Sequence, residues 1–222
     1  MNKKTANKVY GILKKEYPAP STALEHKDAM QLLVATILSA QCTDRRVNIV
    51  TGNLFKKYKN VKDYANAKST EFEKEIKSTG FYRNKAKNII ASAEKIVRDY
   101  DGKVPKTMTE LITLTGVARK TANIVLFHGY GKSEGIAVDT HVRRLSGRLG
   151  FTKHKDPVKI EKDLMDIFDR KKWGYLSDIL ILHGRKVCDA RKPLCPGCSL
   201  RKLCPSAKEF YPDLKNEERH LI

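Results

Sequence analysis

The amino-acid sequence predicts an all-α protein with two domains. Apolar residues recur at helical spacing along almost the whole chain, and we find no convincing run of the alternating pattern that strands require. The chain has 222 residues, which suits one large domain or two small ones. The segments "PAPST" (18–22) and "GYGKSEG" (129–135) have the composition of linkers. They predict a middle domain over residues 22–132 and a discontinuous second domain made of residues 1–21 and 133–222.

Helical periodicity predicts the elements in chain order. Residues 3–16 place Val9, Ile12 and Leu13 on one helical stripe. Residues 28–41 are apolar nearly all round, which is typical of a buried central helix. Further helices are predicted over residues 43–58, 70–80, 84–99, 105–114, 140–148, 157–168 and 173–186. The connections between them are only a few residues long, as in a compact helical fold.

Local signals predict where some of these helices begin and end. Ser69 or Thr70 is expected to cap the helix that ends at Gly80. Pro105 is expected to begin the helix over residues 105–114, with threonines as caps. Asp139 stands directly before "THVRRLSGRL", so we expect its carboxylate to cap that helix.

The charge of the chain indicates its class of partner. The net charge is +19, and the excess runs along the whole sequence rather than forming one tail. A protein this basic favours a polyanion, with nucleic acid ahead of an anionic membrane. The alternative is a set of solvated, lysine-rich helix faces without a polyanionic partner.

The sequence gives no sign of export or of a membrane span. The first twenty residues are basic but contain no long apolar region, so they do not form a secretory signal. The most apolar stretch, "MQLLVATILSA", is about half of the ~20 residues that a spanning helix needs. We expect a soluble, intracellular protein.

Four of the five cysteines lie close together near the C-terminus. Cys188, Cys195, Cys198 and Cys204 form a C-x6-C-x2-C-x5-C array, whereas Cys42 lies far from it and is expected to pack as a small buried residue. Such spacing predicts a metal centre, with an iron–sulfur cluster favoured over zinc. Residues 185–202 hold six basic side chains and one Asp, so this loop could face phosphate groups.

The segment "LTGVARKTANIVL" (114–126) reads as a tight turn followed by a helix. The first amides of a helix that follows a glycine turn point outward and can hold an anion such as a backbone phosphate. Lys120 stands at this helix start, where a cation is disfavoured, and its presence there calls for a functional reason. By itself the turn is a weak signal, because many helix–turn–helix connections contain a glycine.

Four segments taken together resemble the endonuclease III family: "LTGVARKTANIVL", "VDTHVRRLSGRLG" (138–150), "LSAQCTD" (38–44) and the four-cysteine loop. The resemblance covers nearly all of the chain. It implies a helix–hairpin–helix DNA glycosylase with AP-lyase activity that removes oxidised pyrimidines from duplex DNA. It also implies a six-helix barrel domain and a second domain with a 4Fe–4S cluster, with a DNA cleft between them.

The resemblance also assigns roles to individual residues. Lys120 matches the family's nucleophile and Asp139 its catalytic carboxylate. Gln41 matches the residue that fills the gap left by the extruded nucleotide, and Phe81 falls at the apolar wedge position, commonly Leu. The implied cluster ligands are Cys188, Cys195, Cys198 and Cys204. Further DNA contacts are implied for Gly116, Ala118, Arg119, Thr121 and Arg143.

The implied partner is double-stranded DNA with damaged pyrimidines or abasic sites. The resemblance further implies a monomer in the cytoplasm or nucleoid of a prokaryote. Two residues depart from the family's LPGVGRK-like hairpin, namely Thr115 in place of Pro and Ala118 in place of the second Gly. Because Ala adopts a positive φ only at a cost, Ala118 predicts a hairpin that binds phosphate less tightly.

The implied chemistry explains why a lysine stands at the start of this helix. A neutral amine can attack C1′ of a flipped nucleotide, expel the base and form a Schiff base, after which β-elimination breaks the strand. A helix N-terminus favours the neutral amine by less than about one pKa unit, whereas burial contributes several. We therefore expect apolar surroundings for Lys120.

Several of these residues also have simpler interpretations, in which they play no part in catalysis or duplex opening. Lys120 could be a plain phosphate contact, Gln41 a solvent-facing residue at a helix end, and Phe81 part of the core. His141 is expected to be structural.

Two alternative functions compete with the interpretation as a DNA glycosylase with AP-lyase activity. An adenine-mismatch glycosylase carries a glutamate where this chain has Ala35, usually lacks the lysine, and has an additional C-terminal domain. A DNA-binding module without catalysis has no need of both Lys120 and Asp139.

Overall fold

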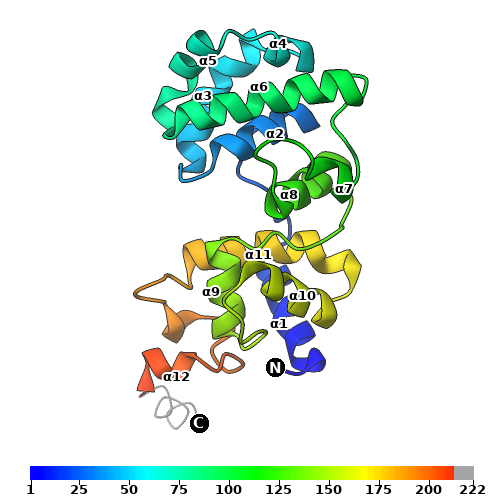
Figure 1. The fold of residues 1–222 in the computed structure, drawn as a ribbon. Coiled ribbons are helices and arrows are strands. Elements are labelled where there is room, and N and C mark those ends of the chain that lie inside the picture. Colours follow the sequence, from blue (N-terminus) through cyan, green and yellow to red (C-terminus); the bar gives the residue numbers. More distant parts are fainter. Residues whose placement is uncertain (213–222) are drawn as a thin grey trace. The chain divides into compact units, whose positions relative to one another are not determined.

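The computed structural model describes residues 1–212, and these residues form helices and turns without any strand, so the predicted all-α class is confirmed (Figure 1). The chain divides into two compact units. The middle unit is Thr22–Glu134, and the terminal unit combines Met1–Ser21 with the segment that begins at Gly135. Each unit has its own hydrophobic core.

The middle unit is built around two helices. Its elements are α2 (Ala29–Leu38), α3 (Asp44–Lys57), α4 (Val61–Ala65), α5 (Ser69–Ile76), the 3-10 turn η1 (Lys77–Thr79), α6 (Tyr82–Asp99), α7 (Met108–Leu111) and α8 (Arg119–Tyr130). Nearly all of α2 is buried, as its apolar composition predicts, and it packs against α3, α6 and α8. The long helix α6 also packs against α4 and α5 (Figure 1). Three of the predicted site residues stand at the ends of these helices: Gln41 follows α2, Phe81 precedes α6, and Lys120 lies at the start of α8.

The terminal unit joins the first helix to the last third of the described chain. Its elements are α1 (Lys3–Glu16), α9 (Thr140–Arg148), α10 (Pro157–Ile167), the 3-10 turn η2 (Arg170–Lys172), α11 (Trp173–Lys186), the 3-10 turn η3 (Cys195–Gly197) and α12 (Ala207–Phe210). Helix α11 packs against both α1 and α9. The apolar stripe of α1 is fully buried at Ala6, Val9 and Leu13. The two ends of the chain therefore complete one core.

The structure corrects four details of the predicted elements. The helix expected over 105–114 is reduced to the four residues of α7, because Thr107 caps it two residues later and a turn follows. The helix expected over 28–41 ends at Leu38. The cap predicted at Ser69 or Thr70 is wrong, because Lys68 holds the cap position of α5 without a side-chain hydrogen bond.

Helix α4 was absent from the predicted elements. It is a single turn, too short for a periodic pattern, and a reciprocal cap between Asn60 and Asp63 stabilises it. Within residues 1–212 no helix combines the length and the apolar character that crossing a bilayer demands.

Candidate active site and metal centre

The hairpin between α7 and α8 is held to the side of α6. Gly116 has a φ of +77°, which only glycine adopts without cost. A methyl group at Gly116 would lie within 2.5 Å of the Asn88 amide nitrogen, so the turn also passes too close to α6 for any side chain. Ser92 donates a hydrogen bond of 2.8 Å to the carbonyl of Thr115. These contacts fix the turn that precedes α8.

Ala118 is the N-cap residue of α8, with a φ of −93° and extended backbone. The positive φ that we expected to strain Ala118 is therefore not observed, and weaker phosphate binding stays a prediction. Alanine also has no side-chain acceptor, so no side-chain cap satisfies the first amides of α8. The N-terminus of this twelve-residue helix therefore has the character that favours an anion.

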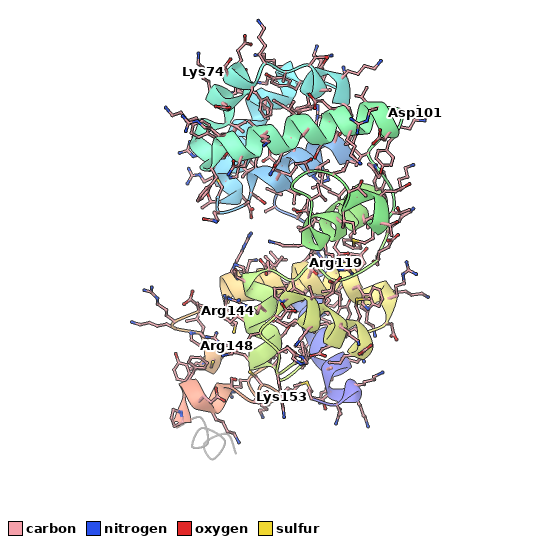
Figure 2. The ribbon with its side chains drawn as sticks, viewed as in Figure 1. Lys74, Asp101, Arg119, Arg144, Arg148 and Lys153 are labelled. Atoms are coloured by element: carbon pink, nitrogen blue, oxygen red, sulfur yellow. The ribbon has the colours of Figure 1, made fainter. Side chains whose placement is uncertain are left out.

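Lys120 is the second residue of α8, and its side chain is exposed. The apolar burial that we expected around this lysine is thus not found in the protein alone. Its neighbours Arg119 and Thr121 are half-buried, and Arg119 at the start of α8 is labelled in Figure 2. Behind them, Ala122 and Val125 anchor the helix in the core of the middle unit. The rigid helix therefore presents the amine to solvent next to the first amides of α8.

Three exposed residues of the middle unit other than glycine have left-handed backbone, namely Gln41, Phe81 and Asp101. Gln41 has a φ of +53° in the turn that follows α2, and Phe81 has a φ of +47° directly before α6. For a residue with a side chain this conformation costs about 1–2 kcal/mol. The Phe81 side chain is 63% exposed, which excludes the alternative that it belongs to the core. Backbone strain of this kind is often found at functional sites, so Gln41 and Phe81 remain candidates for a functional role.

Asp139 caps α9, as the sequence predicts. Its carboxylate accepts a hydrogen bond of 2.8 Å from the Val142 amide and remains half-buried. Nearby, His141 contacts the guanidinium of Arg144, and burial holds the pKa of this histidine below its ordinary value. His141 also abuts Gly184 of α11, where an added methyl group would lie 2.8 Å from its ring. These contacts agree with a structural role for His141.

Arg143 is exposed on α9 and lines a basic groove of the terminal unit. Lys153 and Lys155 line the same groove, whose empty volume of about 1450 Å³ includes space open to solvent. Arg144 and Lys153 are labelled in Figure 2. The groove lysines were not singled out in the sequence, because they stand in a loop without a recognisable pattern.

All four clustered cysteines line one cavity of the terminal unit, together with Leu145, Leu149 and Leu200. Its empty volume is about 380 Å³, including space open to solvent. Among residues 1–212, no three His, Cys, Asp or Glu side chains are close enough together to hold a single metal ion. Cys42 lies in the other unit and packs against its core, as predicted. The donor set is therefore four thiols around a shared apolar space.

Polar side chains that the sequence did not reveal contact these thiols. Arg148 donates a hydrogen bond of 3.2 Å to Sγ of Cys188, and its second contacts reach the carbonyls of Asp189 and Ala190. The buried His183 has its Nε2 atom 3.5 Å from Sγ of Cys198. No spacing signal in the sequence connects Arg148 or His183 with the cysteines, because they lie on other elements.

Burial raises the pKa of three of these thiols. Desolvation is the main cause in each case, and the neighbouring thiols add to it. For Cys198 the pKa rises to about 11. Bringing thiolates together in an apolar cavity is unfavourable unless a metal centre balances their charge. The chemistry of the donor set thus fits a metal cluster.

Comparisons with known proteins agree with this geometry. The family model described as "HhH-GPD superfamily base excision DNA repair protein" matches residues 34–170. The chain is 54% identical over 206 residues to an endonuclease III of Synechocystis sp., covering 93% of this chain and 94% of the relative. It is 46% identical over 189 residues to endonuclease III of Bacillus subtilis, covering 85% of this chain and 86% of the relative.

Solved structures are similar as well. A non-covalent endonuclease III–DNA complex matches with a TM-score of 0.89 and 41% identity, covering 94% of this chain and 98% of the other. A trapped covalent endonuclease III–DNA intermediate matches with the same TM-score and identity.

Proposed function

Because the chain belongs to the HhH-GPD superfamily of base excision DNA repair proteins, within it to the endonuclease III family, we propose that it is a bifunctional DNA glycosylase and AP lyase. Its substrate is duplex DNA that carries oxidised pyrimidines or abasic sites. The observation that carries the proposal is an exposed lysine at the start of α8, directly behind the glycine turn and the uncapped amides. The similar endonuclease III that was trapped as a covalent intermediate with DNA supports a mechanism with a protein nucleophile.

Lys120 is the nucleophile of the proposed reaction. The amine attacks C1′ of the flipped nucleotide, the glycosidic bond breaks and the base leaves with a proton. Loss of the amine proton and opening of the sugar give a Schiff base. Removal of a C2′ proton then expels the 3′ phosphate by β-elimination. Since Lys120 is exposed in the protein alone, the bound nucleotide itself provides the desolvation that favours a neutral amine.

Asp139 is the proposed acid–base group of the same reaction. An ionised carboxylate near the lysine stabilises the ammonium form, so Asp139 does not keep the amine neutral. It accepts the proton from the lysine, directly or through water, and stabilises positive charge on the sugar as the base leaves. Both effects act in the transition state, where they raise the rate.

The remaining predicted residues bind the DNA backbone or the opened duplex. The amides around Gly116 and Ala118, with Arg119 and Thr121, hold phosphate at the hairpin. Arg143 holds phosphate from the groove of the terminal unit. Gln41 fills the gap left by the flipped nucleotide, and Phe81 wedges between the neighbouring bases. Their exposure and strained backbone support this role.

We also propose that Cys188, Cys195, Cys198 and Cys204 hold one 4Fe–4S cluster. The four cysteines line one apolar cavity, and an iron–sulfur cluster is held by four thiolates of this kind. When bound, the cluster would stabilise the terminal unit and the basic loop around it. The hydrogen bond from Arg148 to the sulfur of Cys188 would lower the cost of negative charge on that sulfur. We further propose that the protein acts as a monomer in the cytoplasm or nucleoid of a prokaryote.

Borohydride trapping tests the central assignment. Borohydride reduces a Schiff base to a stable amine, so the wild-type protein should become crosslinked to duplex DNA that carries thymine glycol or an abasic site. Lys120→Gln should abolish the crosslink and retain most of the DNA affinity. Lys87→Gln, which changes an exposed lysine on α6, serves as the matched control. A crosslink that survives Lys120→Gln would refute the assignment, and a wild-type protein that binds but never cuts would indicate a module without catalysis.

A further inference from the structure

Lys85 is a buried lysine that the proposed mechanism does not use. It lies in the first turn of α6, and only 4% of its surface is exposed. Burial holds the pKa of this lysine below its ordinary value. Lysine is almost never buried without partners, because removing an ammonium group from water is costly. A fold that needed only packing here would place an apolar residue at this position.

The ammonium group of Lys85 joins two separate loops. Its Nζ atom donates one hydrogen bond of 2.8 Å to the carbonyl of Leu38 and another of 2.8 Å to the carbonyl of Thr79. Leu38 is the last residue of α2, and Thr79 is the last residue of η1. Carbonyls at such helix ends have no partner within the helix, so Lys85 supplies the donor that each one needs.

These loops carry Gln41 and Phe81, two of the three exposed non-glycine residues with left-handed backbone. Gln41 stands three residues after Leu38, and Phe81 stands two residues after Thr79. The backbone amide of Lys85 also donates a hydrogen bond of 3.1 Å to the carbonyl of Phe81. Lys85 therefore contacts the Phe81 loop through its backbone and side chain, and the Gln41 loop through its side chain.

We propose that Lys85 is a positioning residue that holds the Gln41 and Phe81 loops at a fixed separation, so that gap filler and wedge enter the opened duplex together. This inference rests on the proposed function. Three donors on one ammonium group suit the task, since one buried atom can bind carbonyls from both loops. A preorganised pair of loops needs no ordering when DNA binds, which favours opening of the duplex.

Lys85→Met tests the inference, because it keeps the length of the side chain and removes both hydrogen bonds. Excision of thymine glycol from duplex DNA should slow by about tenfold, within the usual range for coupled contacts. Cleavage of an abasic site in single-stranded DNA, which requires no duplex opening, should change by less than about twofold. The fluorescence of 2-aminopurine placed next to the lesion should show reduced unstacking. Lys87→Met changes an exposed lysine two residues away and is the matched control.

A double-mutant cycle shows whether Lys85 acts through the two loops. Once Gln41→Ala and Phe81→Ala have removed both side chains, Lys85 has nothing left to position. Adding Lys85→Met to that background should therefore slow duplex excision by less than about twofold. An undiminished tenfold loss in that background, or equal losses on both substrates, would overturn the inference.

Misfolding of a variant and failure of the proposed function can each be told apart from failure of this inference. If Lys85→Met does not fold, Lys85→Gln retains one amide donor and enters the same comparison. Failure of both variants to fold would overturn the inference, because Lys85 would then support the whole unit. A wild-type protein that cleaves neither substrate would instead refute the proposed function, before any variant is compared.

Discussion

Asp139 has two roles that a single substitution can separate. Its side-chain oxygen caps α9, and asparagine can accept the same hydrogen bond from the Val142 amide. Asp139→Asn should therefore lower the excision rate by roughly 10²-fold or more, the scale of general acid–base catalysis, while Tm barely changes. Single-turnover excision and thermal unfolding measure the two effects. A variant that excises at nearly the wild-type rate would limit Asp139 to capping.

Two effects require glycine at position 116, namely its positive φ and its close contact with Asn88. Gly131, at the other end of α8, helps to separate them. Gly116 and Gly131 both have positive φ, at +77° and +67°, but only Gly116 lies against another side chain. Gly131→Ala should cost about 1–2 kcal/mol of unfolding free energy from backbone strain alone. Gly116→Ala should cost about 1–3 kcal/mol more, because Asn88 and the turn must move apart. Denaturant unfolding measures both, and equal losses would show that the contact with α6 is unimportant.

At the scale of elements, the proposed iron–sulfur cluster makes a prediction about the cysteine loop. Purified protein should contain about four irons per chain and no stoichiometric zinc. Cys195→Ser should lower the iron content and the Tm, because a structural metal centre contributes directly to folding. Cys42→Ala, in the core of the other unit, should leave the iron content unchanged. Stoichiometric zinc with little iron would contradict the cluster.

The sequence predicted long elements better than it predicted their ends. The burial of α2 and the apolar stripe of α1 follow from the spacing of apolar residues, which a window of about ten residues already shows. The short α4 depends on a reciprocal cap between Asn60 and Asp63, which spans only four residues. The conformation of Ala118 could not be read from its identity, because alanine fits both the extended cap observed and a helix interior.

The candidate site shows the same division. Lys120, Asp139 and the cysteines could be proposed from the sequence, because each stands in a short segment that resembles a family motif. Lys85, Arg148 and His183 could not, because each acts on residues that only the fold brings near. In the sequence, Lys85 is one of two lysines in the segment "NKAKNII", and only its burial distinguishes it.

At the scale of the whole molecule, the net charge of +19 should make DNA binding strongly dependent on salt. Each phosphate contact releases counterions, so the logarithm of the binding constant should fall linearly with that of salt concentration, with a slope of about −0.9 per contact. Arg143→Gln should reduce the steepness by about one contact. Fluorescence anisotropy at several salt concentrations measures this, and an unchanged slope would remove Arg143 from the interface.

The discontinuous terminal unit has a consequence for synthesis on the ribosome. Helix α1 is made first, yet its partner α11 is complete only at Lys186, 170 residues after Glu16. At common translation rates that delay is about 10–30 s, long enough for the contiguous middle unit to fold first. During this interval Val9 and Leu13 have no core to enter. Chaperones that scan nascent chains should therefore bind the stripe of α1, and release it when α11 emerges.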